Sequence, residues 1–133
     1  MKIYIASRYS RRNEMRDLAN ELRQMGHEVS TRWLETNFET DARGRSATAP
    51  AEYRAKYAEI DMEDVRAADC VINFTEPPDD GGRGGRHVEF GFAVALGKRL
   101  IVVGYRENLF HHLPVVEFYS SKWDMLRAIA TCT

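Results

Sequence analysis

The sequence predicts an α/β protein whose central sheet is parallel and is covered by helices on both faces. Apolar runs at residues 2–7, 70–74 and 99–104 have the length and composition of buried strands. Segments with helical or turn-forming patterns separate these runs, so strands and helices alternate along the chain. The first strand, helix and strand fit within about thirty residues, which is typical of a right-handed βαβ unit. We therefore expect a doubly wound sheet of five strands, Rossmann-like or flavodoxin-like, in a single domain over residues 1–133.

A helix is expected directly after the first strand. Ser10 can cap its first turn, and Gly26 can end it by adopting a left-handed conformation. Residues 27–33 then alternate between apolar and polar side chains and are expected to form the second strand. Apolar side chains recur in the helix at helical spacing, namely Met15, Leu18, Ala19, Leu22 and Met25.

Two acidic residues interrupt the apolar face of the next expected helix. Residues 35–49 before it are polar and turn-rich, and a loop of this length is often a lid or a binding loop. Pro50 suits the first position of the helix. Asp61 and Asp64 share its broad inner face with Tyr53, Tyr57, Ile60, Val65 and Ala68. Acids on such a face cost free energy unless they are paired or border a polar cleft, so they indicate either a functional site or solvated edge positions.

A glycine-rich loop leads into the helix expected around Glu89. The stretch at residues 79–98 reads DDGGRGGRHVEFGFAVALGK, and Glu89 stands near the expected start of the helix. Unpaired N–H groups and the positive end of the helix dipole favour anions there, and should hold Glu89 ionised. An ionised carboxylate in a cleft can act as a nucleophile or a base. The alternative is an ordinary first-turn acid that follows a solvent-exposed loop.

The ends of the strands place three loops at the expected ligand site. Residues 99–104 and 115–119 are expected as the fourth and fifth strands, and Ser121 can cap a last helix. In doubly wound sheets, ligands bind beyond the carboxyl ends of the strands, near the point where the strand order reverses. The loops that follow the first, third and fourth strands meet at that edge. The residues expected to contact a ligand there are Ser7, Arg8, Asp80, Gly82, Arg83, Gly85 and Asn108.

The first two of these loops are rich in arginine, which indicates an anionic ligand. A phosphate is the simplest such ligand, because guanidinium groups bind it through paired hydrogen bonds. A solvated basic rim is the alternative. The five residues concerned are Arg8, Arg11, Arg12, Arg83 and Arg86.

Composition and absent motifs narrow the classes of function. The net charge of −1 gives no general attraction to nucleic acid or to an anionic membrane. We expect a cytoplasmic protein, because the sequence opens on a strand pattern, without a signal peptide or a bilayer-spanning run. The turn ASRYSRR lacks the glycines of a dinucleotide site, and the later glycine loop lacks the GK[ST] ending of an NTPase loop.

No metal or organic cofactor is expected. Cys70 and Cys132 lie too far apart in the sequence for a metal motif, and Cys70 is expected to be a buried thiol. His111 and His112 have no third ligand at a suitable spacing, so we interpret them as loop or interface residues.

The chain resembles the nucleoside 2-deoxyribosyltransferases and the related deoxynucleoside 5′-monophosphate N-glycosidases. The resemblance spans almost the whole chain and rests on the segments IYIAS, IDMEDVRAADCVI and HVEFGFAVALGK. The last is similar to the E-[LIF]-G-[YF]-A block of the family, which implies that Glu89 is the nucleophile. Asp61 falls on the acid at the base side of the substrate, and Tyr4 on the tyrosine that holds the nucleophile.

This resemblance implies cleavage of a nucleoside through a covalent sugar intermediate. The glutamate attacks the anomeric carbon of a 2-deoxyribosyl group, and water or a second base then resolves the ester. It also implies a homo-oligomer, a dimer at least, in which the neighbouring chain helps to close the active site. The apolar residues 105–119 are expected at or near that interface, or else they cover the last edge of the sheet.

One position departs from the family pattern and bears on the substrate. Six residues before the glutamate, the transferases carry an acid and the monophosphate hydrolases a serine, whereas this chain has Arg83. The arginine favours a phosphorylated nucleotide as the substrate. A nucleotide-binding module without turnover and an N-glycosidase of ribonucleotides remain as alternatives. The pairing of Glu89 with Asp61 argues against binding alone, because an anion does not call for two acids.

Overall fold

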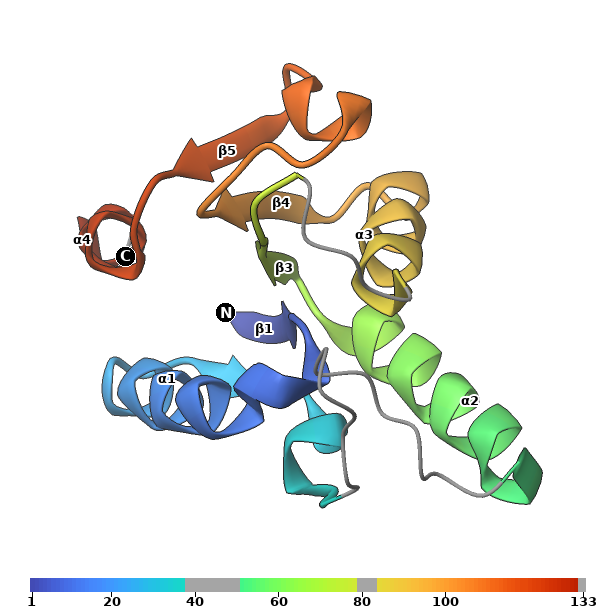
Figure 1. The fold of residues 1–133 in the computed structure, drawn as a ribbon. Coiled ribbons are helices and arrows are strands. Elements are labelled where there is room, and N and C mark those ends of the chain that lie inside the picture. The colour runs from blue at the N-terminus through green and yellow to red at the C-terminus, as the bar shows by residue number, and fades with distance from the viewer. Residues whose placement is uncertain (38–50, 79–83, 132–133) are drawn as a thin grey trace.

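The structure is a five-stranded parallel sheet with helices on both faces (Figure 1). It is a computed structural model that describes residues 1–37, 51–78 and 84–131. The strand order is β2-β1-β3-β4-β5, which is the flavodoxin-like order and confirms the predicted fold class. The order reverses between β1 and β3, so a ligand site is expected beyond these two strands. The strands are β1 (Lys2–Ala6), β2 (Glu28–Val29), β3 (Cys70–Phe74), β4 (Arg99–Val103) and β5 (Val116–Tyr119).

Two helices cover each face of the sheet (Figure 1). One face packs against the N-terminal and C-terminal helices, and the other packs against the two helices that flank β3. The helices are α1 (Arg12–Gln24), α2 (Ala51–Ala67), α3 (Gly85–Ala95) and α4 (Lys122–Thr131). No helix in the described ranges is long and apolar enough to cross a membrane.

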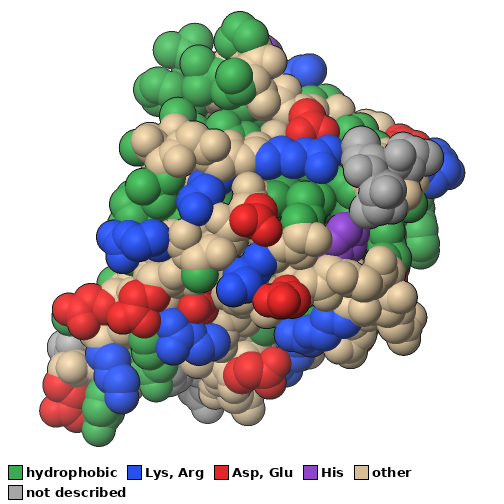
Figure 2. Space-filling view, turned by 180° about the vertical axis from the view of Figure 1, so that it is seen from behind, with side chains coloured by type: hydrophobic (Ala, Val, Ile, Leu, Met, Phe, Trp, Pro, Cys, Tyr) green, Lys and Arg blue, Asp and Glu red, His purple; other side chains and the backbone are tan. Residues whose placement is uncertain are grey.

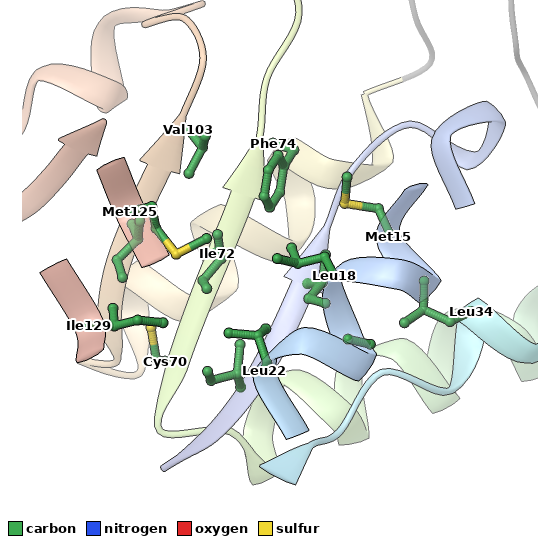
Figure 3. Packing of buried hydrophobic residues seen from close by; sticks show 14 residues of the cluster. Met15, Leu18, Leu22, Leu34, Cys70, Ile72, Phe74, Val103, Met125 and Ile129 are labelled. Atoms are coloured by element: carbon green, nitrogen blue, oxygen red, sulfur yellow. The ribbon is translucent and has the colours of Figure 1, made fainter. Parts of the chain in front are cut away.

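Each face of β3 supports a separate hydrophobic core. Ile72 and Phe74 pack with α1 and α4 on one face (Figure 3). Val71 packs on the other face with Tyr4 of β1 and with the inner residues of α2 and α3. All residues of β3 are buried, as its nearly continuous apolar sequence predicts, and successive side chains point to opposite faces. Tyr4 is fully buried in the second core, so its hydroxyl needs a partner there.

The second strand is shorter than the sequence predicts. The expected strand at residues 27–33 ends at Val29, and the chain then enters a 3-10 turn at Arg32–Glu35. The N–H of Ser30 still donates to the carbonyl oxygen of Ile3 at 2.9 Å, and side-chain hydrogen bonds hold the chain beyond it. Ser30 Oγ donates to the carbonyl oxygen of Asp64 at 3.1 Å, and Trp33 Nε1 donates to that of Ile5 at 2.9 Å. The alternating pattern was therefore misleading beyond Val29.

The helix boundaries match the predicted signals in part. Gly26 ends α1 with a φ of +93°, and Ser121 Oγ accepts a hydrogen bond from the N–H of Asp124 at the start of α4. Ser10 does not cap α1, because it lies in a 3-10 turn at Tyr9–Arg11 and the helix begins after it. Pro50 and most of the predicted loop at residues 35–49 lie outside the described residues.

Candidate active site

Tyr4 and Glu89 meet between the sheet and α3. The hydroxyl of Tyr4 donates a hydrogen bond to Oε2 of Glu89, across the core that joins β1 to α3. Burial, together with the nearby carboxylates of Glu89 and Asp61, raises the pKa of Tyr4 well above its usual value. Tyr4 therefore keeps its proton at neutral pH and remains a donor to Glu89.

Glu89 lies deeper in its helix than the sequence predicts. Gly84 has a φ of +82° and precedes α3, which begins at Gly85, so Glu89 falls in the second turn. The expectation that the helix end holds Glu89 ionised is wrong. Burial and the neighbouring Asp61 raise the pKa of Glu89 to about 8, although the hydrogen bond from Tyr4 acts in the opposite direction. The ionisation of Glu89 is thus coupled to that of Asp61.

Asp61 faces the same core from α2. Its pKa is raised to about 7 by burial and by the carboxylate of Asp64, while Arg32 partly offsets this rise. Asp61 in turn raises the pKa of Glu89, so the two acids oppose each other's ionisation. Near neutral pH, such a pair holds one proton more readily than none. One partner can then act as a nucleophile and the other as an acid.

The structure separates the roles of the two acids that the sequence places on one helix face. Asp64 is buried, and its carboxylate accepts hydrogen bonds from Arg32. Asp61 is only partly buried and interacts electrostatically with Tyr4 and Glu89. Asp64 is therefore a paired structural charge, whereas Asp61 remains available to a ligand.

The loops after β1 and β3 converge, as predicted. Arg11 Nη1 donates to Glu76 Oε2 at 2.8 Å, and Arg8 Nη1 lies 4.0 Å from Glu76 Oε1. Ser7 Oγ donates to the carbonyl oxygen of Arg8 at 2.9 Å. Ser7 and Arg8 thus lie at the predicted edge, and Gly85 opens α3 there. Asp80, Gly82 and Arg83 lie outside the described residues.

The arginines in the described ranges do not form an open basic rim. Arg11 is ion-paired with Glu14 and Glu76. Arg12 lies over the ring of Tyr9, with its guanidinium carbon 4.7 Å from the ring centroid. Arg86, expected from the sequence to face an anionic ligand, is buried against an acid from another loop.

That acid is Glu107, which sequence reasoning missed. Arg86 donates to it through Nε at 3.2 Å and Nη2 at 2.7 Å, and the N–H of Glu76 donates at 2.8 Å. Nε2 of His87 lies 3.3 Å from the same carboxylate. Glu107 therefore ties the loops after β3 and β4 to the first turn of α3. No sequence signal marks this partnership, because it depends on which loops the fold brings together.

Asn108 lies on a different side of α3 from Glu89. Its Oδ1 accepts from the N–H of Phe110 at 2.9 Å, and its amide nitrogen lies 3.4 Å from Nδ1 of His87. Asn108 borders a cavity of 460 Å³ lined also by His87, Phe90, Gly91, Val94 and Phe110. These α3 positions recur every three or four residues and exclude Glu89, so the structure does not bring Asn108 to the Tyr4–Glu89 pair.

A second residue missed by the sequence reasoning is Asn73. It follows Val71 by two positions in β3 and so projects toward the core that holds Tyr4. Its side chain is fully buried, and neither amide atom has a hydrogen-bond partner among the described residues. An unpaired buried amide is costly, and this one lies beside the point where the strand order reverses. Within an apolar run, however, Asn73 carried no recognisable motif.

Comparison with known proteins gives one family match. The family described as nucleoside 2-deoxyribosyltransferase matches residues 3–120. No curated protein matches this chain. In the described ranges, no group of three or more His, Cys, Asp or Glu side chains is arranged to hold a metal ion.

Three solved structures are similar to this chain over nearly its whole length. A CMP N-glycosidase from Clostridium botulinum has a TM-score of 0.63 and 21% identity, over 98% of this chain and 99% of its own. A 2-deoxyribosyltransferase from Bacillus psychrosaccharolyticus has a TM-score of 0.70 and 22% identity, over 95% of this chain and 90% of its own. A conserved protein from Enterococcus faecalis has a TM-score of 0.66 and 17% identity, over 100% of this chain and 99% of its own. At these identities the likeness establishes a shared fold.

Proposed function

The chain belongs to the nucleoside 2-deoxyribosyltransferase family, and from this we propose that it cleaves or transfers the N-glycosidic bond of a 2′-deoxynucleoside through Glu89. The observation that carries the proposal is the hydrogen bond from Tyr4 to Glu89, with Asp61 close enough to raise the pKa of Glu89. A buried tyrosine donor and two coupled acids are the groups that a retaining glycosyl transfer requires. They exceed what binding alone requires.

The reaction proceeds in two displacements at the anomeric carbon. A carboxylate oxygen of Glu89 bonds to C1′ while the bond from C1′ to the base nitrogen breaks, and the electron pair of that bond leaves with the base. Asp61 supplies a proton to the departing base. Water or a second base then attacks C1′, which breaks the ester bond and restores the Glu89 carboxylate. The proton of the attacking nucleophile returns to Asp61.

The hydrogen bond from Tyr4 favours Glu89 as the nucleophile of the two acids. A hydroxyl donor stabilises the ionised form of its carboxylate, so the negative charge is favoured on Glu89. The pKa of Glu89, about 8, is nevertheless no lower than that of Asp61, about 7, so the free site does not fix the shared proton on Asp61. The reaction draws on the form in which Glu89 is ionised and Asp61 holds the proton, and the hydrogen bond from Tyr4 increases the population of that form.

The substrate we propose carries a 5′-phosphate. Arg8 supports this, because it follows the end of β1 at the edge where the loop after β3 approaches through Glu76. Arg11 and Arg86 are ion-paired with Glu76 and Glu107 and are poorer candidates. The glycosidase from Clostridium botulinum is named for CMP, which favours a nucleoside monophosphate and keeps a ribonucleotide as the second candidate.

A panel of substrates tests the function directly. The purified protein is incubated with deoxyribonucleosides and ribonucleosides, each with and without a 5′-phosphate, and release of the free base is measured by chromatography. We expect release from a deoxyribosyl substrate and, in intact-protein mass spectra, a transient sugar adduct on Glu89. Glu89→Gln should lose the adduct and about 10³-fold or more in rate. Glu59→Gln, on the exposed side of α2, is the matched control and should keep both.

We also propose that the active protein is a homo-oligomer with the segment between β4 and β5 at the interface. Hydrophobic side chains gather at that end of the molecule (Figure 2). Leu109 and Phe110 are 79% and 61% exposed, beside the apolar cavity on α3. Sedimentation should give a dimer or larger assembly that Phe110→Ser dissociates. Trp123→Ser, which removes an exposed aromatic ring from α4, should not dissociate it.

A further inference from the structure

Asp64 is held by two donors from a single residue. The backbone N–H of Arg32 donates to Oδ2 at 2.9 Å, and Nε of the same arginine donates to Oδ1 at 2.9 Å. Only 6% of Asp64 is exposed, so this carboxylate depends on Arg32 to offset its desolvation. Arg32 also reaches Glu63, whose side chain is well exposed.

This ion pair lies one helical turn from Asp61. Asp61 and Asp64 are separated by three positions in α2, which places them on the same side of the helix. Among the described residues, the elements packed against this side bring three titratable or charged groups: Tyr4 from β1, Glu89 from α3 and Arg32 from the turn after β2. Arg32 is the cation in this set, and the hydrogen bond from its Nε to Oδ1 of Asp64 holds the guanidinium group beside that carboxylate.

We propose that the Arg32–Asp64 pair is a positioning device that sets how strongly Asp61 holds the proton it gives to the leaving base. This inference rests on the proposed role of Asp61 as an acid. Burial and the negative charge of Asp64 favour the protonated form of Asp61, and the positive charge of Arg32 limits that effect. The two charges act on Asp61 in opposite directions, so the geometry of the pair adjusts the pH range that burial sets.

The pair also explains why the second strand stops early. A continued strand would commit the N–H of Arg32 to the sheet or to solvent. In the observed 3-10 turn at Arg32–Glu35, that N–H is instead directed at Asp64, and Ser30 Oγ bonds to the carbonyl oxygen of the same residue. The departure from the predicted strand therefore provides the buried carboxylate of Asp64 with a backbone hydrogen-bond donor.

The inference is tested by substituting Asp64 and Arg32, because the two substitutions should shift the pH profile of the reaction in opposite directions. Base release is measured as kcat/KM against pH for the wild type, for Asp64→Asn and for Arg32→Gln. Asp64→Asn removes a negative charge, so the alkaline limb that reports Asp61 should move down by about 1 pH unit. Arg32→Gln removes a positive charge and should move the same limb up. Glu63→Gln removes only the exposed partner of Arg32 and should leave the limb unchanged.

A measurement that does not require turnover keeps the test independent of the proposed function. The carboxyl resonance of Asp61 in ¹³C-aspartate-labelled full-length protein is titrated in the same variants, and Asp61→Asn assigns the signal. Opposite shifts of this titration support the inference even if no glycoside is cleaved, in which case only the proposed function fails. Shifts in the same direction in both variants, or no shift in either, would overturn the positioning role.

Discussion

The hydroxyl of Tyr4, in the middle of β1, donates its hydrogen bond to the carboxylate of Glu89 in the second turn of α3. The tyrosine ring is held rigidly by the core, so the position of its hydroxyl is fixed by the sheet rather than by a loop. The acceptor belongs to a helix that packs on the same sheet face. A nucleophile held in this way is oriented before the substrate binds, which lowers the entropic cost of reaching the transition state.

Removing the Tyr4 hydroxyl should weaken catalysis more than binding. Tyr4→Phe keeps the ring and its packing but leaves Glu89 without its donor. Loss of a hydrogen bond to a charged group costs about 1.5–3 kcal/mol, or about tenfold to a hundredfold in kcat/KM. The pKa of Glu89 should rise, so the acidic limb of the pH profile should move to higher pH.

The control for this change is Tyr119→Phe, which removes a hydroxyl that donates to Glu117 in β5 at 3.2 Å. It should leave both kcat and the pH profile unchanged. A Tyr4→Phe enzyme with an unshifted acidic limb would show that Tyr4 does not act on Glu89 in solution.

Glu89 should make the stability of the protein fall as the pH rises. Its pKa is raised from 4.5 to about 8, so the folded state binds the proton of Glu89 more tightly than the unfolded state. The contribution of Glu89 to the free energy of unfolding is therefore fully present below about pH 4.5 and is lost progressively as the pH rises through about 8. Glu89→Gln cannot ionise and escapes this loss.

Thermal unfolding of the two proteins checks this sign. The melting temperature of Glu89→Gln, relative to the wild type, should increase by about 5–10 °C between pH 5 and pH 8.5. Glu14→Gln is an informative control with the opposite trend. The hydrogen bond from Arg11 lowers the pKa of Glu14, so that carboxylate stabilises the fold at neutral pH, although solvent exposure reduces its effect.

The strands and the identity of the main acids could be predicted because both give recognisable patterns within short stretches of the sequence. β3 and β4 are buried on both faces and appear as nearly continuous apolar runs, so their predicted bounds lie within one residue of those observed. Glu89 and Asp61 stand out as acids in helices that otherwise face a core. The segments around these two acids resemble blocks of one family, and this resemblance links positions that are distant in the sequence.

The ionisation of the site and its loop contacts could not be predicted, because both depend on long-range geometry. Glu89 lies in the second turn of α3 rather than at the helix end, and burial together with Asp61 raises its pKa, against the expectation of an ionised carboxylate. Arg86 resembled an anion-binding residue until the loop after β4 brought Glu107 against it. An amino-acid pattern records the residue types on a loop, but not which other loop they meet.

Arg86 and Glu107 should contribute to stability as a pair. The side chains are 5% and 8% exposed, so Arg86→Met leaves a buried carboxylate without its main partner. Breaking such a pair typically costs about 3–5 kcal/mol, which corresponds to a fall of about 10 °C or more in the melting temperature. The double variant Arg86→Met with Glu107→Leu should recover most of this loss, because it removes both charges.

The double-mutant cycle also discriminates between a structural and a ligand-binding Arg86. A structural ion pair requires strong coupling between the two substitutions in thermal unfolding without any ligand. If Arg86→Met keeps the wild-type melting temperature and loses activity on monophosphates alone, then Arg86 binds phosphate and its contact with Glu107 contributes little.

Arg8 should distinguish phosphorylated from unphosphorylated substrates. Its guanidinium group lies at the end of β1, where the loop after β3 approaches through Glu76. We expect wild-type kcat/KM to be higher for a deoxynucleoside monophosphate than for its nucleoside. Arg8→Ala should lower the monophosphate value by about tenfold to a hundredfold, as expected for one charged hydrogen bond, and should leave the nucleoside value unchanged.

The control is Arg23→Ala, on the exposed side of α1, which should change neither kcat/KM value. Equal wild-type activity on both substrates would contradict the phosphate proposal, and it would leave Glu89 and Asp61 to act on a plain nucleoside.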